Sequence, residues 1–251
     1  MSPYLLEVVA YSYASALEAQ LGGADRIELC ENSAEGGTTP SLGTIEAVRA
    51  LPGIKLHVMI RPRGGDFHYT ATEFKIMLRE IALAKAAGAD GVVFGVLTPQ
   101  AKVDLPRLRE LVAAAQGMST TFHRAFDWVS HPLPALQDIQ AAGCDRVLTS
   151  GQAPNALAGA NLIAQLVAQA QPQFKIMAGG GVNAKNVLEL IQKTGVTEIH
   201  GSLGTVQPTT MQVRPTGLSL GSAPRWEIDA IPVASRAQVA EVSRLLKSQL
   251  Q

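Results

Sequence analysis

Apolar residues along the chain follow two alternating patterns, one typical of β-strands and the other of helices. Four similar segments each begin with a glycine and continue as a short strand, at 23–30, 88–95, 143–150 and 195–202. Four more strand-like runs lie among them, at 5–10, 55–60, 120–123 and 174–178. Stretches with helical periodicity, such as 71–88 and 155–171, separate the strands. This alternation predicts a parallel β-sheet covered by helices.

Eight strand–helix units in 251 residues match the size of a (β/α)8 TIM-type barrel, an α/β fold. The main alternative is an open doubly wound sheet. The first strand–helix connection lacks the G-x-G-x-x-G fingerprint of many such sheets, and the fourfold repeat favours a closed barrel. No Pro/Ser-rich linker interrupts the chain, so we expect a single domain over 1–251.

We expect the barrel to occupy about 4–205 and a C-terminal tail to occupy 206–251. The tail contains Pro208, Pro215 and Pro224, which predict irregular chain. Helical periodicity returns at 235–250 and predicts a final helix that packs on the bottom or the outside of the barrel.

Composition narrows the classes of partner. The 21 basic and 21 acidic residues balance, so the sequence gives no reason to expect nucleic acid. No apolar run approaches the roughly 18 residues of a membrane span, and the N-terminus lacks the pattern of a signal peptide. Two cysteines suit a reducing compartment, so we expect a cytoplasmic protein. The sequence is compatible with a homo-oligomer and specifies no oligomeric state.

Many polar residues fall on the strand faces that point into the barrel. Strand residues alternate between the interior and the helix layer, and the apolar helix-facing residues fix the phase of each strand. The predicted interior set is Glu7, Arg26, Glu28, Cys30, Lys55, His57, Arg61, His123, Arg146, Lys175, Glu198 and His200. An unpaired ion in such an interior costs several kcal/mol, so these groups must pair.

The position of each residue along its strand divides this set in two. A structural ion network is expected near the strand starts, from Arg26, Lys55, Arg146, Lys175 and Glu198. A functional site is expected near the strand ends, where barrel enzymes have their active sites, from Glu28, Cys30, Arg61, His123 and His200.

Two loops after strands add candidate residues. In RPRGGDFHY (61–69), Arg61 or Arg63 could bind a carboxylate or phosphate, with Asp66 nearby. The alternative is that these arginines form salt bridges with Asp66 or Asp127.

In HRAFD (123–127), His123 could be a general base or a metal ligand, oriented by Arg124 or Asp127. Together with Glu28, these residues form the candidate catalytic set.

Glycine-rich segments follow the last two strands. In barrels such backbone often binds phosphate through free N–H groups, here with a helix start expected at Asn183. The candidate anion-binding residues are Gly179, Gly180, Gly181, Gly201 and Ser202.

Taken together, the motifs EVVAYS, GADRIELCENSAEGGTTPS, IRPRGGDF, TFHRAFD, RVLTSGQ, IMAGGGV and EIHGS resemble the CutC family of copper homeostasis proteins. The resemblance runs from about residue 5 to residue 205. It implies a cytoplasmic TIM-type barrel with a role in copper tolerance or Cu(I) binding, and no defined reaction. The family's motif residues correspond to Glu28, Cys30, Arg61, Arg63, Asp66, His123, Arg124 and Asp127.

Copper chemistry restricts where such a site could lie. Cu(I) prefers thiolate and thioether ligands. Cys30 ends its strand whereas Cys144 begins its own, so one chain places the two thiols at opposite ends of the barrel. An intramolecular site would therefore use Cys30 with His123, His200 or a methionine. The alternative is that both cysteines are small buried residues.

Three functional hypotheses follow. The first is a Cu(I)-binding protein for copper homeostasis. The second is an enzyme acting on a small anionic metabolite, such as a phosphorylated one, at the C-terminal mouth of the barrel. The third is a scaffold with a vestigial site.

Overall fold

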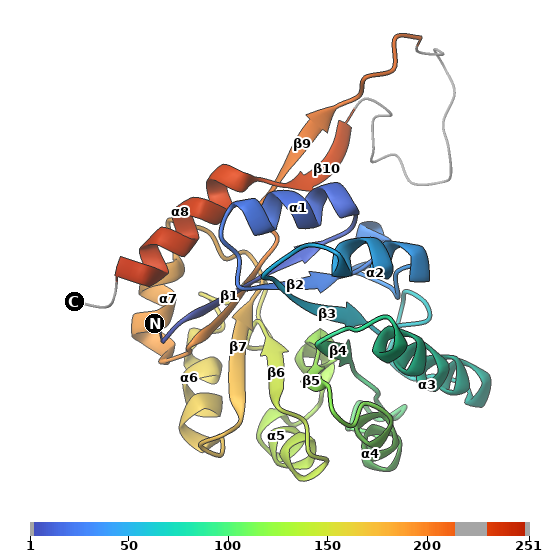
Figure 1. Ribbon diagram of the computed structural model, residues 1–251. Coiled ribbons are helices and arrows are strands. Elements are labelled where there is room, and N and C mark those ends of the chain that lie inside the picture. Colours follow the sequence, from blue (N-terminus) through green and yellow to red (C-terminus); the bar gives the residue numbers. More distant parts are fainter. Residues whose placement is uncertain (1–2, 214–229, 249–251) are drawn as a thin grey trace.

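The computed structural model describes residues 3–213 and 230–248. Eight parallel strands close into a barrel in chain order, and β8 pairs with β1 (Figure 1). The strands are β1 (Leu5–Ala10), β2 (Arg26–Leu29), β3 (Lys55–Met59), β4 (Gly91–Phe94), β5 (Ser119–Phe122), β6 (Arg146–Thr149), β7 (Lys175–Gly179) and β8 (Glu198–Gly201). The predicted TIM-type barrel is therefore confirmed, and closure excludes the open doubly wound sheet.

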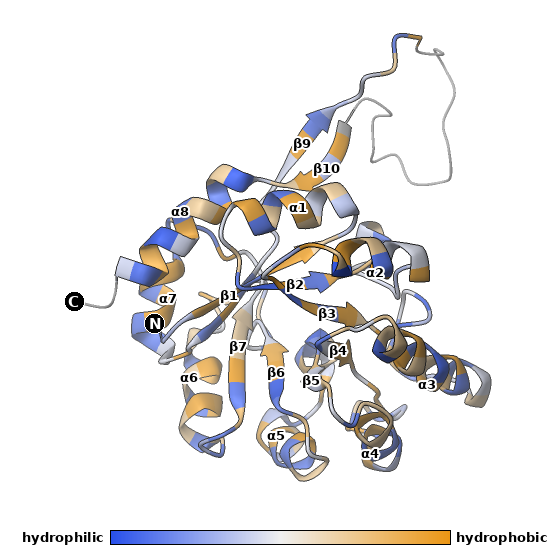
Figure 2. Ribbon diagram, in the orientation of Figure 1, coloured by the Kyte–Doolittle hydropathy of each residue, from blue (hydrophilic) through white to orange (hydrophobic). Residues whose placement is uncertain are grey.

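Helices surround the barrel, and each combines apolar and polar residues (Figure 2). Their buried apolar residues share one core with those of the strands. The helices are α1 (Tyr13–Leu21), α2 (Leu42–Arg49), α3 (Ala71–Ala86), α4 (Leu105–Ala114), α5 (Pro132–Ala141), α6 (Ala160–Gln169) and α7 (Val187–Thr194). Local sequence sets their starts: Thr70 and Glu73, for example, form a capping box at α3. Helix α7 begins four residues later than expected, because residues 184–186 form a turn.

Strand phase follows the predicted alternation. On β3, Leu56 and Val58 are fully buried in the large apolar core between barrel and helices. Parallel pairing aligns Glu7 with Arg26, and Glu28 with His57, on neighbouring strands. The charged side chains of successive strands are thus stacked in layers inside the barrel.

The segment after the barrel is more regular than expected. Residues Gly204–Pro208 (β9) and Ala230–Ala234 (β10) pair as an antiparallel ribbon that projects from the barrel (Figure 1). Pro208 therefore lies in a strand, whereas Pro215 and Pro224 lie outside the described residues.

The final helix, α8 (Arg236–Lys247), packs on the outside against α1 and α7, as one of the two expected placements had it. Val239 of α8 packs so closely on Gly22 that a Cβ at position 22 would lie 2.6 Å from the Cβ of Val239. The contact therefore requires a glycine at this position. Among the described residues, no helix combines the length and apolar character needed to cross a membrane.

Candidate functional site

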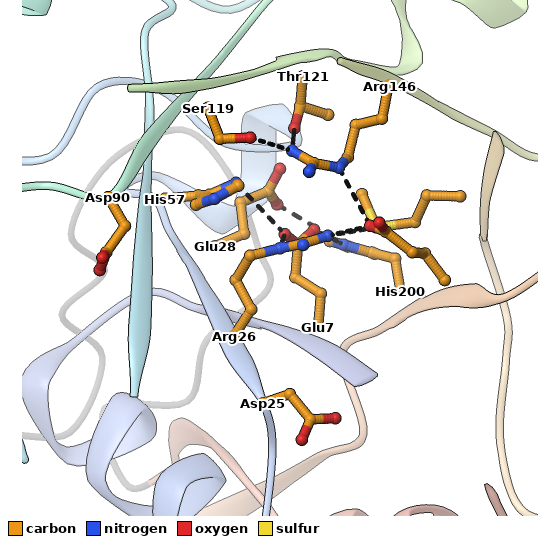
Figure 3. Close-up of polar contacts among 12 residues, drawn as sticks. Glu7, Asp25, Arg26, Glu28, His57, Asp90, Ser119, Thr121, Arg146 and His200 are labelled. Atoms are coloured by element: carbon orange, nitrogen blue, oxygen red, sulfur yellow. Dashed lines mark hydrogen bonds and ion pairs between the residues drawn. The ribbon is translucent and has the colours of Figure 1, made fainter. Parts of the chain in front are cut away.

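The lower part of the barrel interior holds a buried ion network (Figure 3). Arg26 donates hydrogen bonds to Glu7 and Glu198, and Arg146 donates to Glu198 as well. These four side chains are almost completely buried. The predicted structural network is therefore present for Arg26, Arg146 and Glu198, with Glu7 as an additional member.

The two lysines expected in this network do not join it. The Lys55 side chain is 69% exposed and pairs with Asp90, which also binds Arg49 on the outside of the barrel. Lys175 is partly buried and forms no ion pair among the described residues. Both lysines are the first residue of their strand, so their flexible side chains can turn to the barrel's end.

Above this network, Glu7 connects to the upper layer through His200. Nδ1 of His200 lies 2.8 Å from Oε1 of Glu7, and its Nε2 lies 3.8 Å from Oε2 of Glu28. Burial lowers the pKa of His200, but the charge of Glu28 and the bond to Glu7 outweigh burial and raise it. Burial would likewise raise the pKa of Glu7, yet Arg26 and His200 hold it well below its usual range.

Glu7, Glu28 and His200 also form a group whose ligand atoms lie within 4.8 Å of one another and could hold a metal ion. Both oxygens of Glu7 are already engaged, one by His200 and one by Arg26. An ion would therefore find Glu28 and Nε2 of His200 as its open ligands.

Glu28 is the carboxylate at the cavity end of the series of contacts that runs from Arg26 through Glu7 and His200. It is 3% exposed, and its Oε1 has no hydrogen-bond partner among the described residues. Its Oε2 accepts a long bond from the thiol of Cys30, at 3.6 Å. Burial raises the pKa of Glu28 to about 7. A carboxyl group with this pKa can accept and return a proton at neutral pH.

His123 faces the same cavity as a neutral hydrogen-bond donor. Its Nδ1 accepts from the backbone N–H of Ala125 at 3.1 Å, so the proton of the neutral ring is on Nε2. Burial and the charge of Arg61 lower the pKa of His123 to about 3. Nε2 is buried and has no partner among the described residues. In this arrangement it offers a proton to a ligand, not a lone pair to a metal.

Arg61 shapes the wall beside His123. Its terminal nitrogens donate to the carbonyl groups of Glu35, Gly37 and Gly65, which leaves only Nε without a partner among the described residues. The guanidinium group lies 5.1 Å from the ring centre of Phe67.

Arg63 forms salt bridges, which was the alternative expected for the arginines of this loop. It pairs with Asp66 and with Glu73 and lies outside the cavity, although Asp66 itself lines it. Neither Arg63 nor Arg61 bonds to Asp127 among the described contacts. Arg63 therefore holds the loop together and is not displayed toward a ligand.

Asp127 also anchors a loop. Its carboxylate accepts bonds from Thr149, Ser150 and the backbone of Gln152, all at the end of β6, and from Arg124. It thereby fixes the 3-10 helix η2 (Arg124–Trp128) against the neighbouring strand. Of this pair, only Arg124 lines the cavity.

The glycine segments form the opposite edge of the cavity. Gly180, Gly181, Gly201 and Ser202 line it. The N–H groups of Gly180 and Gly181 make no hydrogen bond within the described part of the chain, and their φ angles of 107° and 71° favour glycine. Gly179 lies lower, in β7, packed against Leu148 and His200. Because α7 begins only at Val187, its N-terminus does not directly follow this edge.

The two cysteines lie at opposite ends of the barrel strands, as the sequence indicated. Cys144 precedes β6, whereas Cys30 follows β2. The Cys30 thiol contacts Glu28, which lines the cavity, but Cys30 itself does not line it. Burial and the nearby Glu28 raise the pKa of the Cys30 thiol well above its usual value. The sulfur lies 3.1 Å from the point that a Cβ on Gly37 would occupy, and Cε of Met59 lies 3.6 Å from that point.

All these groups surround a cavity of about 670 Å³ at the C-terminal ends of the strands. It brings together Glu28, Arg61, Asp66, His123, Arg124, His200 and four residues of the glycine edge, as the sequence predicted for one mouth. Its apolar lining is formed by Val9, Tyr11, Met59, Phe67, Trp128 and Leu148. Strand phase places Met59 inside the barrel, but the sequence reasoning missed the other five. Trp128, directly after the HRAFD motif, was the available signal for this lining.

Comparison with known proteins identifies the family. The CutC family model matches residues 4–205. The chain belongs to the CutC family. A CutC family protein from Bacteroides thetaiotaomicron is 44% identical over 99% of this chain and 100% of its own length. Another from Chromobacterium violaceum is 46% identical over 87% of this chain and 89% of its own.

Solved structures agree with this membership. A Streptococcus agalactiae structure described as a putative copper homeostasis protein CutC matches this CutC-family chain with a TM-score of 0.76 and 36% identity. The match covers 79% of this chain and 98% of the other. The thiamine phosphate pyrophosphorylase of Pyrococcus furiosus has a TM-score of 0.61 at 16% identity over 100% of this chain and 98% of its own, which shows the shared barrel fold alone.

Proposed function

We propose that this CutC-family protein is an enzyme that moves a proton on a small anionic metabolite bound at the mouth of the barrel. One observation carries the proposal: two buried polar atoms of opposite character, Oε1 of Glu28 and Nε2 of His123, lack partners among the described residues, and both residues line one cavity. A buried group without a partner costs about 1–3 kcal/mol. A ligand that offers both a donor and an acceptor would remove this cost.

The chemistry of the two groups suggests a reaction. The Glu28 carboxylate would remove a proton from the carbon next to a carbonyl group. The electron pair of that C–H bond would move onto the carbonyl oxygen, where the Nε2–H of His123 would stabilise the developing negative charge. Glu28 would then return the proton to carbon. Its pKa of about 7 suits both directions of transfer.

The rest of the cavity supports an anionic substrate. Gly180 and Gly181 present N–H groups without partners among the described residues, and Arg124 lines the same cavity. A carboxylate or phosphate at this edge would place the neighbouring carbonyl group between the glycine edge and Glu28.

Solvent deuterium exchange tests this function on a panel of candidate substrates. We expect the protein to exchange a C–H proton of at least one compound in a panel of α-keto acids and phosphorylated ketoses in D2O, followed by proton NMR. Glu28→Gln should slow this exchange about 100-fold or more, because the amide cannot accept the proton. The exposed Glu31, which lies outside the cavity, provides the control Glu31→Gln. Exchange at the wild-type rate in Glu28→Gln, or no exchange with any compound, would exclude the reaction.

Copper binding is a second candidate, favoured by a separate observation. A thiol and a thioether, from Cys30 and Met59, lie beside the space above Gly37, and these are ligand types that Cu(I) prefers. The donors therefore fit the ion in kind. The high pKa of Cys30 means that binding must release its proton, so affinity should rise with pH.

We expect Cys30→Ser to weaken Cu(I) binding at least about tenfold, since a hydroxyl group is a poor ligand for this soft ion. Cys144→Ser should leave binding unchanged, because Cys144 lies at the opposite end of the barrel. A competition titration against a Cu(I) chelator under reducing conditions measures both. Equal losses in the two variants would indicate a site shared between chains, and no loss in either would rule out a thiol site.

A further inference from the structure

Trp128 is a large apolar side chain that the fold leaves uncovered. It is 68% exposed, although it lines the cavity and ends η2 directly after the catalytic candidates of the HRAFD motif. Among the described residues, only one ring packs against it: Phe67, whose centroid lies 6.2 Å away at an interplanar angle of 73°. This edge-on contact leaves the faces of the indole without a parallel partner.

The backbone on both sides of Trp128 is held in place. The preceding residue, Asp127, accepts hydrogen bonds from Thr149, Ser150 and Gln152. The carbonyl of the following residue, Val129, accepts a 2.6 Å bond from Nε2 of Gln152. Exposed side chains on surface loops are ordinarily free to move, whereas this one is carried by a rigid support. Rigid presentation reduces the entropy lost when a ligand binds.

Aromatic contacts connect Trp128 to the proposed reaction centre. Phe67 contacts Trp128 on one side, and its centroid lies 5.0 Å from the ring of His123 on the other. The aromatic wall thus extends from the rim of the cavity to the donor Nε2–H. The cavity volume of about 670 Å³ exceeds what a three-carbon anion needs, and cavities of this size ordinarily hold drug-sized ligands.

We infer that the substrate carries a planar aromatic ring, which stacks on Trp128 while its anionic, reacting end lies between Glu28 and the glycine edge. The inference rests on the proposed function for the position of the reacting end only. The ring subsite itself rests on the exposure, support and contacts of Trp128. Aromatic rings prefer offset-stacked or edge-to-face partners, and the indole offers a free face at the mouth.

A pair of probes that differ in the ring tests the inference. Isothermal calorimetry would compare phenylpyruvate with pyruvate, which share the keto acid group. The wild-type protein should bind phenylpyruvate roughly tenfold more tightly. Trp128→Ala should reduce this preference to about threefold or less, whereas Trp128→Phe should retain most of it because a ring remains. An unfolding curve by circular dichroism would verify that each variant is folded.

Several results would overturn the inference: equal affinity for the two probes, no measurable binding of phenylpyruvate, or an unchanged preference in Trp128→Ala. Light scattering, which measures the mass of the particle in solution, would reveal one further contradicting result. If Trp128→Ala lowered the mass of an oligomer and kept the probe preference, the indole would be an interface residue. The two measurements on the wild-type protein separate this inference from the proposed function. A ring preference without proton exchange on any compound of the panel would refute the reaction and keep the subsite, whereas proton exchange without a ring preference would refute the subsite alone.

Discussion

Replacing Arg26 with methionine is expected to lower the free energy of unfolding by about 3–5 kcal/mol. Arg26 is 3% exposed and is the group that joins the carboxylates of Glu7 and Glu198. Without it, two negative charges remain in the barrel interior with fewer positive partners. Removing one member of a buried ion network costs far more than removing an exposed one, because the remaining charge cannot regain its hydration.

Chemical denaturation in urea, followed by circular dichroism, measures this loss. Lys55→Met is a matched control, since Lys55 begins the neighbouring strand but pairs with Asp90 at the exposed end of the barrel. It should cost less than about 1 kcal/mol. Similar losses in the two variants would contradict the proposed importance of the interior network.

Arg26→Met could prevent folding altogether, and a second variant covers that case. The double variant Arg26→Met/Glu198→Gln removes one of the uncompensated carboxylates. We expect it to fold and to be less destabilised than the sum of its single changes, because the two residues are in contact. Strict additivity would contradict the pairing.

The barrel could be predicted from the sequence because its pattern is local. Leu56 and Val58 alternate with His57 and Met59, and this alternation fixes which side of the strand faces the helices. The same reasoning failed for Lys55. Alternation gives the direction of a Cα–Cβ bond, but a long side chain at the end of a strand can bend toward solvent and toward a partner such as Asp90, and the sequence does not show that partner.

The convergence of Glu28, Arg61 and His123 at one mouth also followed from strand phase. The chemical role of each group at this mouth could not be predicted from strand phase. The tautomer of His123 depends on a bond from the backbone of Ala125, and the charge of His200 depends on Glu7, 193 residues away along the chain. Such contacts arise only when the barrel closes. The ribbon of β9 and β10 escaped notice for a related reason, since its partner strands are separated by a long insertion.

Ionisation of Glu28 is expected to reduce the stability of the fold as the pH rises. Its pKa is raised from 4.5 to about 7, chiefly by burial, so the folded state holds this proton more tightly than the unfolded chain does. The stabilising contribution of the proton is therefore complete below pH 4.5 and is lost as the pH rises through 7. A shift of this size corresponds to about 3 kcal/mol, at about 1.4 kcal/mol per pH unit.

Glu28→Gln removes this titration, so a comparison of the two proteins isolates it. The free energy of unfolding of the wild type minus that of Glu28→Gln should fall by about 2–3 kcal/mol between pH 5 and pH 8. Urea denaturation at several pH values would measure the difference. Because the charge of Glu28 also raises the pKa of His200, the comparison should be repeated in a His200→Gln background.

A difference that stays constant with pH in both backgrounds would show that Glu28 titrates normally, and it would remove the main reason to regard it as a base. The expected fall in this difference between pH 5 and pH 8 would instead support the role of Glu28 as a base. A fold that keeps a carboxyl group where its ionised form is destabilising loses stability at the pH at which a proton acceptor is useful. The same Glu28→Gln change that slows proton exchange should then stabilise the barrel, relative to the wild type, more at pH 8 than at pH 5, which is the relation expected of a catalytic group and not of a structural one.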